Sequence, residues 1–140
     1  MTKQLHLTIV SQEKKLLDEQ VDSITLPASE GEITVLPDHI PLFTKLSTGE
    51  LIYRQGKEEH SFVITKGFVD IGPDNHVQIM VDAAIAAKEI SLEKAQQAIQ
   101  NAQRTMEQSQ DQRELMLAEA SLRQAMWEIR VAQKSRKVKI

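Results

Sequence analysis

The hydrophobic periodicity of this sequence changes once along the chain, within residues 83–89. Before that segment, apolar and polar residues alternate in short runs separated by turn-forming residues, as in strands with one buried face. After it, turn-forming residues disappear and apolar residues recur at steps of three and four, as in amphipathic helices. The two periods cannot belong to one kind of element, so we predict two regions of different architecture.

The first region carries short strand-like runs. They lie at residues 5–9, 21–26, 33–36, 62–64, 68–71 and 77–81. Turn-forming segments separate them, at residues 27–31, 37–38, 48–49, 55–57 and 72–75. Short strands at this spacing are typical of a sandwich or a barrel. We expect residues 1–85 to form an antiparallel β-sandwich, or flattened barrel, and the whole chain to be α+β by domain.

The second region is predicted to be an antiparallel α-helical hairpin over residues 91–140, which follows a hinge at 86–90. Ser91 can cap the first helix, because its hydroxyl can accept a hydrogen bond from a free amide of the first turn. A short polar run separates two helices, expected at about 91–107 and 112–134. The periodic apolar residues are Leu92, Ala95, Ile99, Ala102 and Met106, then Leu115, Ala118, Leu122, Ala125, Ile129 and Ala132.

Large side chains alternate with alanine along the predicted seam between the two helices. Each alanine in place of leucine forgoes three carbons, roughly 2 kcal/mol of burial at about 0.8 kcal/mol per methylene, so we expect a weakly held pair. The second helix carries another apolar stripe, formed by Met116, Ala120, Trp127 and Val131. A two-helix hairpin cannot bury both stripes, so either the sandwich or a partner protein covers the second one.

The two regions also differ in charge. Residues 1–90 carry 8 Lys and Arg against 14 Asp and Glu (net −6), whereas residues 91–140 carry 9 against 6 (net +3). Beyond Glu128 there is no acidic residue, and the basic residues are Arg130, Lys134, Arg136, Lys137 and Lys139. These cations either complement a helix dipole and a solvated tail or dock on an acidic protein surface. Nucleic acid is disfavoured, because the whole chain is acidic and the basic run lacks interleaved aromatic residues.

The sequence lacks the residue patterns of an enzyme or a metal site. It contains no cysteine, its four histidines are dispersed without ligand-type spacing, and no glycine-rich phosphate loop precedes a helix. Asp38 and His39 are the one pair suited to acid–base chemistry, but neighbours on a strand point to opposite faces. We therefore expect a polar turn contact there, and no catalytic residue, metal or cofactor in the chain.

No membrane-spanning or secretory segment is expected. A bilayer-spanning helix needs roughly 20 consecutive apolar residues, and no run of that length occurs. The first twenty residues mix Lys, Glu and Asp with alternating apolar residues, unlike a signal peptide. With no cysteine, the usual rationale for a small secreted domain fails. We expect an intracellular protein that is monomeric in isolation.

Residues 29–42 carry a family resemblance. They read SEGEITVLPDHIPL, which resembles the signature of the epsilon subunit of rotary F-type ATP synthases, in which a glycine and a short β run lead into Pro-x-His-x-Pro. The similarity extends to residues 46–49, 66–69 and 77–82 and to the helical region, and so covers essentially the whole chain. Asp38 occupies a position that glycine often holds in this family.

The resemblance implies a non-catalytic central-stalk (rotor) subunit. Its sandwich would bind the gamma subunit and rest on the c-ring, and so help to couple ion transport to ATP synthesis. Its hairpin would open and rise along gamma into the catalytic head of alpha and beta subunits, where it inhibits ATP hydrolysis. Such a subunit is peripheral at the cytoplasmic face of the plasma (inner) membrane and associates with the membrane only through the complex.

The resemblance also nominates contact residues. Those assigned to the c-ring and gamma are Glu30, Gly31, Glu32, Asp38 and His39. Those assigned to gamma and the catalytic head, when the hairpin is extended, are Met116, Trp127, Arg130, Lys134 and Arg136.

Two alternative functions remain open: an ATP-sensing regulatory module, or an unrelated adaptor whose hairpin pairs with another coiled coil. ATP-binding relatives resemble Ile-Asp-x-x-Arg-Ala at the start of the first helix, where this chain has Ser91 and Lys94 in place of the aspartate and the arginine. Gln124 and Glu128 stand where those relatives carry arginines. A lysine does not replace a planar bidentate donor, and a carboxylate opposes phosphate. We expect weak ATP binding or none at millimolar concentration.

Overall fold

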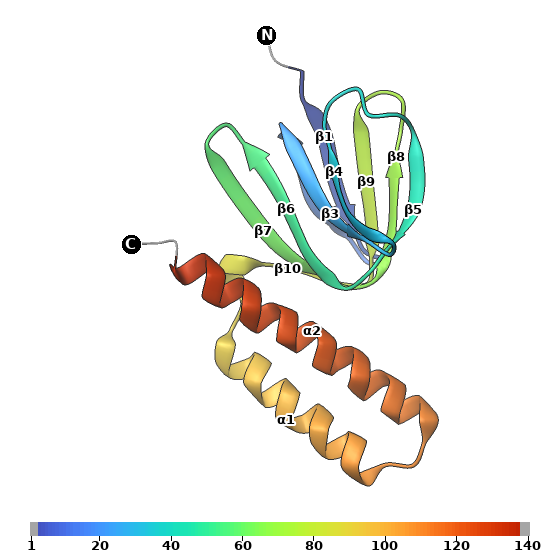
Figure 1. Ribbon diagram of the computed structural model, residues 1–140, viewed down its shortest axis with the longest axis vertical. Helices are drawn as coiled ribbons and strands as arrows, with labels where there is room; N and C mark the ends of the chain where they lie inside the picture. Colours follow the sequence, from blue (N-terminus) through green and yellow to red (C-terminus); the bar gives the residue numbers. More distant parts are fainter. Residues whose placement is uncertain (1–2, 138–140) are drawn as a thin grey trace. The chain divides into compact units, whose positions relative to one another are not determined.

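The computed structural model describes residues 3–137. The chain divides into two compact units, Met1–Ile85 and Ala86–Ile140. The first unit is a β-sandwich and the second is a helical hairpin (Figure 1). The predicted fold class is therefore confirmed.

The β unit is built from short strands. They are β1 (Leu5–Val10), β2 (Lys15–Val21), β3 (Ser23–Ala28), β4 (Gly31–Val35), β5 (Leu42–Leu46), β6 (Gly49–Gln55), β7 (Glu58–Ile64), β8 (Gly67–Ile71), β9 (His76–Val81) and β10 (Ala84–Ala86). Their order is β10-β7-β6-β3-β5-β8-β9-β1-β2, and β4 pairs with β3 beside this path. β3 pairs with β6 through several residues but with β5 only through Ala28 and Leu46. The sheet turns at that short pairing, which allows its two halves to enclose a core.

One pairing in the sandwich is parallel. β1 pairs with β2 in antiparallel orientation but with β9 in parallel. This pairing is an exception within the expected antiparallel sandwich. Alternation of apolar and polar residues predicts that a strand has one buried face and carries no information on the direction of its neighbour.

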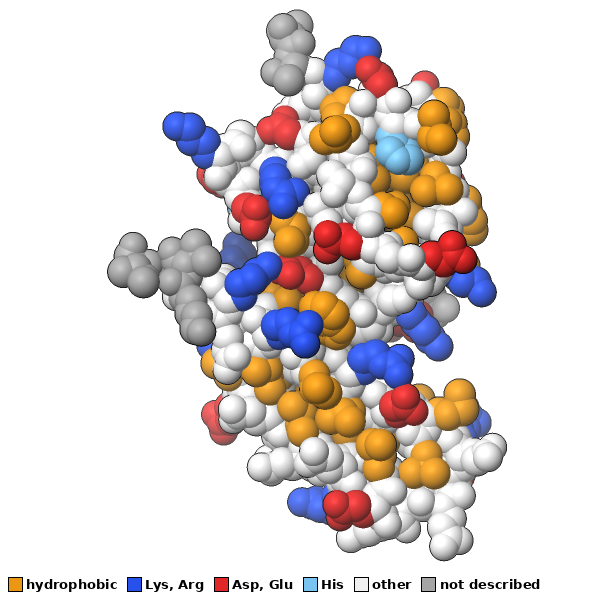
Figure 2. All heavy atoms as spheres, in the orientation of Figure 1, with side chains coloured by type: hydrophobic (Ala, Val, Ile, Leu, Met, Phe, Trp, Pro, Cys, Tyr) orange, Lys and Arg blue, Asp and Glu red, His pale blue; other side chains and the backbone are white. Residues whose placement is uncertain are grey.

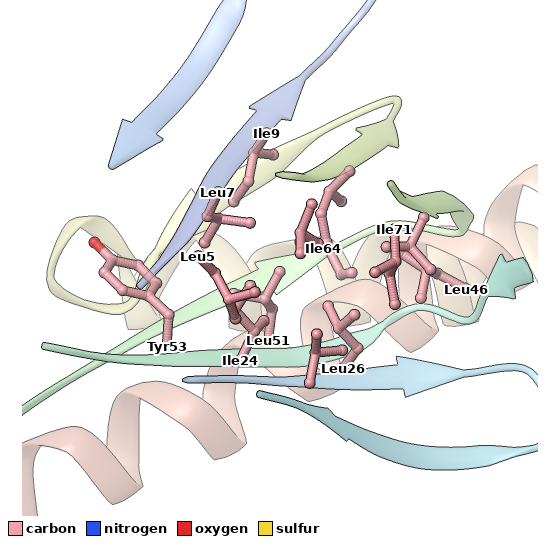
Figure 3. Close-up of a cluster of buried hydrophobic side chains, with 14 of the residues drawn as sticks. Leu5, Leu7, Ile9, Ile24, Leu26, Leu46, Leu51, Tyr53, Ile64 and Ile71 are labelled. Carbon is pink, nitrogen blue, oxygen red and sulfur yellow. The ribbon is translucent and has the colours of Figure 1, made fainter. Parts of the chain in front are cut away.

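Alternate residues of the strands fill one apolar core. Leu5, Leu7 and Ile9 of β1 are fully buried, and so are residues of each facing strand such as Ile24 and Leu51. Figure 3 shows these side chains, from several strands, gathered in one cluster. Fully burying one such side chain contributes about 1.5–3 kcal/mol, so this cluster holds the unit together.

The sequence analysis missed part of the sandwich. It did not identify β2, β5 or β6, and β7 begins at Glu58, before the expected run at 62–64. In β2 only Val21 is fully buried, so the strand lacks the alternation by which strands are recognised. β10 spans the expected boundary between the sandwich and the hinge, in an alanine-rich segment where we identified no strand. Pairing of β10 with β7 overrides the helix propensity of its alanines.

The hairpin begins with a short 3₁₀ turn. Its elements are η1 (Ala87–Glu89), α1 (Leu92–Gln108) and α2 (Gln112–Lys137). Ser91 is the N-cap of α1, where its hydroxyl accepts a hydrogen bond from the Lys94 amide at 3.2 Å. In the connection between the helices, the Ser109 hydroxyl donates to the Glu114 carboxylate at 2.6 Å.

Alanines form the buried part of the seam between α1 and α2. The buried residues there are Ala95, Ala102, Ala118, Ala125 and Ala132. On each helix they recur every seven residues, as knobs do in a coiled coil. The large seam residues Leu115, Leu122 and Ile129 are only half-buried. Small side chains allow the two backbones to approach closely, but they bury little apolar surface.

The second apolar stripe of α2 is not a uniform surface. Met116 is 70% exposed and Ala120 is also exposed, whereas Trp127 is half-buried and Val131 is fully buried. The C-terminal part of α2 lies near η1 of the same unit. The stripe is therefore exposed at its N-terminal end only, which corrects the expectation of one continuous face.

Candidate functional site

Asp38 and His39 lie in a tight turn after β4. The His39 amide donates to the Leu36 carbonyl at 3.1 Å, with Pro37 and Asp38 between them. Asp38 directly follows Pro37 and has a φ of 68°. A proline at the second position of a turn and a positive φ at the third identify a type II turn. Glycine fits that position best, which explains why glycine is common there in the resembling family. Asp38 and His39 therefore lie in a turn, whereas we expected them to be neighbours on a strand.

The Asp38 carboxylate is tied to the rest of the sandwich. It accepts hydrogen bonds from Lys3 Nζ at 2.9 Å and from Asn75 Nδ2 at 3.3 Å, and the Asp38 amide donates to Asn75 Oδ1 at 2.6 Å. The hydrogen bond from Lys3, and to a smaller extent the one from Asn75, holds the pKa of Asp38 below its usual value. The His39 ring contacts the Ile40 carbonyl through Nδ1 at 2.6 Å, so that nitrogen carries the proton. The expected polar turn contact is present, and Asp38 orders the turn.

Glu30, Gly31 and Glu32 form the tip of the β3–β4 hairpin. Gly31 pairs with Ala28 and has a φ of 135°, a conformation that other residues rarely adopt. All three tip residues are exposed. The structure places them at the opposite end of β4 from Asp38 and His39, about 17 Å away for five residues at 3.3 Å each. The predicted contact residues therefore form two groups.

β5 runs between these two groups. It begins beside the Asp38 turn, and at its other end the Lys45 carbonyl accepts a hydrogen bond from the Ser29 amide of the hairpin tip at 3.0 Å. On its outer face, the Phe43 ring stacks on the Phe68 ring of β8 with centroids 5.6 Å apart. Phe43 is 62% exposed and Phe68 is 41% exposed.

Other exposed apolar side chains lie close to this aromatic pair in sequence. They are Leu36, Ile40 and Leu42. Figure 2 shows hydrophobic side chains gathered over the part of the unit where β5 and β8 lie in Figure 1. Leu42 precedes Phe43 on β5 and pairs with the buried Ile71, so it lies on the core side of the strand. We call the exposed pair Phe43 and Phe68, with the neighbouring exposed residues Leu36 and Ile40, the apolar face. The sequence analysis did not identify it, although the apolar residues beside the Pro-x-His-x-Pro string were a signal.

A cavity of about 600 Å³ adjoins the apolar face at the N-terminal end of β8. Phe68, Met80 and Val10 contribute apolar walls, Lys45 and Lys66 supply ammonium groups, and Asp82 supplies one carboxylate. A side chain at Gly67 would place its Cβ 2.0 Å from the Met80 carbonyl, so only glycine lets β8 approach β9 here. The apolar face and this cavity together form a concave, largely apolar surface with two lysines, which suits a protein partner.

The residues nominated on α2 make different contacts. The Arg130 guanidinium lies 4.6 Å from the centre of the Trp127 ring, a cation–π contact within the helix. Arg136 Nη2 donates to the Ile90 carbonyl at 3.1 Å, and Met116 is exposed. Lys134 also has an interaction partner. Lys139, counted in the basic run, lies outside the described residues.

The positions compared with ATP-binding relatives are occupied by local contacts. Ser91 caps α1, and Gln124 Nε2 donates to the Glu128 carboxylate at 3.0 Å. Glu128 therefore uses its acceptor oxygens on a neighbouring side chain of the same helix. Weak ATP binding or none remains a prediction.

Residues 3–137 contain neither a candidate metal site nor a candidate membrane-spanning helix. No group of three or more His, Asp or Glu side chains there could hold a metal ion. None of the helices in this part of the chain is long and apolar enough to cross a membrane.

Comparison with known proteins adds the family. The family model described as "ATP synthase, Delta/Epsilon chain, beta-sandwich domain" matches residues 4–87. An ATP synthase epsilon chain of Syntrophobacter fumaroxidans is 39% identical over 135 residues, covering 96% of this chain and 100% of the relative. An ATP synthase epsilon chain of Dehalococcoides mccartyi is 40% identical over 134 residues, or 95% of both chains.

Solved structures of ATP synthases contain similar chains. A chain in the cryo-EM structure of the Euglena gracilis mitochondrial ATP synthase (OSCP, F1 and c-ring in rotational state 1) matches with a TM-score of 0.78 and 30% identity, covering 93% of this chain and 81% of that one. A chain of the Tetrahymena thermophila mitochondrial ATP synthase central stalk and c-ring matches with a TM-score of 0.60, over 94% of this chain and 98% of that one. At 15% identity, the second match shows the shared fold alone.

Proposed function

The chain belongs to the ATP synthase delta/epsilon chain family, as its sequence resemblance predicts, and from this membership we propose that it is a non-catalytic rotor subunit. In this role the β-sandwich links the gamma subunit to the c-ring and helps to couple ion transport to ATP synthesis. The subunit is peripheral at the cytoplasmic face of the membrane and reaches the membrane only through the complex. The hairpin regulates ATP hydrolysis.

The apolar face carries the proposal for gamma. Two stacked phenylalanines in water, beside a concave cavity, are unusual for a surface that stays exposed. Aromatic side chains set in such surroundings contribute most of the binding energy at protein interfaces. Phe43 and Phe68 are therefore the anchors that we assign to the contact with gamma, with Lys45 and Lys66 facing acidic groups of the partner.

The tip of the β3–β4 hairpin is the part that we assign to the c-ring. Glu30 and Glu32 are exposed carboxylates, and Gly31 adopts the positive φ that shapes the tip. The tip adjoins β5 through the Ser29 and Lys45 backbone contact. One subunit can therefore present an acidic tip and an apolar face to two different partners.

The hairpin supplies the regulatory part of the proposal. Its seam is closed by alanines, so little buried apolar area opposes opening. Exposed Met116 and the basic residues Arg130, Lys134 and Arg136 offer apolar and cationic contacts to gamma and to the catalytic head in an extended state. A weakly held closed form that makes such contacts when open is the property that a reversible inhibitor requires.

Binding to gamma tests the sandwich assignment. Replacing both Phe43 and Phe68 with alanine should weaken binding of purified gamma about tenfold or more, because each is an anchor side chain. The control is Leu117→Ala, which removes an exposed apolar side chain from the hairpin. Affinity of the folded double variant within twofold of the control would exclude the apolar face as the gamma contact.

Removing the hairpin tests the regulatory assignment. A chain truncated after Lys88 should retain gamma binding and proton pumping in the reconstituted enzyme but hydrolyse ATP faster. Unchanged hydrolysis would leave the hairpin a structural role only. Loss of pumping would show that coupling depends on the hairpin.

A further inference from the structure

A side-chain contact joins the two ends of the hairpin. Arg136, near the end of α2, donates from Nη2 to the backbone carbonyl of Ile90 at 3.1 Å. Ile90 lies between η1 and the N-cap Ser91, and only 2% of its surface is exposed. The contact therefore joins the last turns of α2 to the segment from which α1 starts, 46 residues earlier.

The carbonyl of Ile90 needs this donor. Intrahelical bonding of α1 starts one residue later, where the Ser91 carbonyl accepts from the Ala95 amide at 3.0 Å. A buried carbonyl that accepts no hydrogen bond destabilises the fold, because its contacts with water are lost and not replaced. The guanidinium supplies a charged donor, which makes a stronger bond than a neutral one.

The other arginine contacts of α2 do not cross the hairpin. Arg123 pairs with Glu119 one turn earlier, and Arg130 lies over Trp127, also one turn earlier. These contacts move with α2 and survive a separation of the two helices. Among the arginines in the described part of α2, Arg136 alone has a side-chain bond that opening must break.

We propose that Arg136 is a latch that holds the hairpin closed, and that opening releases its guanidinium to bind a carboxylate of the catalytic head. This inference rests on the regulatory role proposed above. One guanidinium group then serves two states in turn: it bonds the Ile90 carbonyl in the closed state and an acidic partner in the open one. A contact made only in the closed state shifts the equilibrium toward that state by the free energy of the contact.

The isolated full-length chain provides the direct test. The chain has no cysteine, so Ala95→Cys introduces a single thiol at a seam position that is 1% exposed. A thiol reagent modifies it only when the hairpin opens. In this background, Arg136→Gln should raise the modification rate about tenfold or more, as expected for the loss of one hydrogen bond to a charged group.

Arg130→Gln is the matched control. It removes the same charge from the same helix but breaks no contact between α2 and another element, so the modification rate should change less than twofold. Circular dichroism should show the same helix content in all variants. Equal rates for Arg136→Gln and Arg130→Gln would overturn the latch.

Hydrolysis by the assembled enzyme separates the latch from the proposed regulation. If the hairpin inhibits, Arg136→Gln should hydrolyse ATP more slowly than Arg130→Gln. Both variants lose one cation assigned to the catalytic head, but only Arg136→Gln also releases the latch and so opens more of the hairpin. A rate equal to or above that of Arg130→Gln would overturn control of inhibition by the latch. If truncation after Lys88 leaves hydrolysis unchanged while Arg136→Gln still raises thiol modification, the regulatory role fails and the latch itself stands.

Discussion

In the sandwich, the buried residues of the core are leucine, isoleucine, valine and one tyrosine, whereas along the seam of the hairpin they are alanines. Both units are compact, but the apolar area that each removes from water differs greatly per buried residue. The sandwich therefore has the stability expected of a permanent anchor. We expect the hairpin to be the less stable of the two units.

Each unit contains its own spectroscopic reporter. The chain has one tyrosine and one tryptophan. Tyr53 lies in the sandwich core and Trp127 on α2. Tyrosine ellipticity and tryptophan fluorescence therefore follow the two units separately, and the comparison between them can be tested within one molecule.

The largest effect is expected in the sandwich core. Leu7→Ala should lower the free energy of unfolding of the sandwich by about 2–5 kcal/mol, because Leu7 is fully buried and the truncation leaves a cavity. Urea titration followed through Tyr53 measures it. Leu117→Ala, at a position 63% exposed, should cost less than about 0.5 kcal/mol. Equal effects would contradict the assignment of stability to the sandwich core.

A smaller effect is expected at the seam. Ala125→Leu should destabilise the hairpin by about 1–3 kcal/mol, because close helices leave no room for a larger side chain. The tryptophan signal should report the loss while the tyrosine signal stays unchanged. Ala120→Leu, on the exposed part of α2, is the control. A more stable Ala125→Leu hairpin would show that the seam is loosely packed.

Low pH should destabilise the sandwich. Hydrogen bonds from Lys15 and then His6 hold the pKa of Asp18 below its unfolded value of 3.8. A carboxyl whose folded pKa is lowered stabilises the fold above the unfolded value, and the stabilisation is lost as pH falls through the folded pKa. The stability of the sandwich should therefore fall less steeply in Asp18→Asn than in the unchanged chain as the pH is lowered from 3.8 through the folded pKa of Asp18.

The control for the acid experiment is Asp74→Asn. Asp74 is exposed and makes no ion pair with the described residues. Stability measured through Tyr53 should depend on pH in this variant as it does in the unchanged chain. An equally flattened profile would show that net charge, and not the Asp18 contacts, sets the acid response.

The type II turn provides a finer comparison within the sandwich. At a φ of 68°, alanine crowds its Cβ against the backbone, so Asp38→Ala should be about 1 kcal/mol less stable than Asp38→Gly. Both variants lose the carboxylate contacts with Lys3 and Asn75 and keep the bond from the residue 38 amide to Asn75 Oδ1, so the difference isolates the backbone conformation. Thermal unfolding of both variants measures it, and equal midpoints would argue against the turn type.

The smallest effect is expected from ATP. Neither unit should be stabilised by millimolar ATP, because Ser91, Lys94, Gln124 and Glu128 do not supply the bidentate guanidinium donors that phosphates favour. Isothermal titration calorimetry measures the binding directly. A micromolar dissociation constant would make the chain an ATP-sensing module.

Strands with strong alternation were predictable from sequence, and strands without it were not. β1, β3, β8 and β9 correspond to recognised runs, because apolar residues recur at alternate positions along them. In β1 and β3 the intervening Thr8 and Thr25 are buried as well. β2 and β5 each bury only their last residue, Val21 and Leu46. Their place in the sheet depends on pairing with neighbours, which their own residues do not specify.

The candidate site was predictable only in part, for a related reason. The Pro-x-His-x-Pro string drew attention to Asp38 and His39, which form the turn. The pairing of Phe43 with Phe68 was not predictable, because the two residues are 25 positions apart and meet only when β5 pairs with β8. A motif identifies residues that are close in sequence, whereas a binding surface gathers residues from neighbouring strands.

By itself, the sequence determined that the chain has a β unit followed by an α unit, and which helix faces meet, because periodicity follows from backbone geometry within each element. Only the tertiary structure decided the order of the strands, the parallel pairing of β1 with β9, the apolar face and its cavity, and the bond from Arg136 to the Ile90 carbonyl. These features depend on which distant segments lie side by side. A backbone carbonyl in particular looks the same at every position of a sequence, so its partner is known only once the chain has folded.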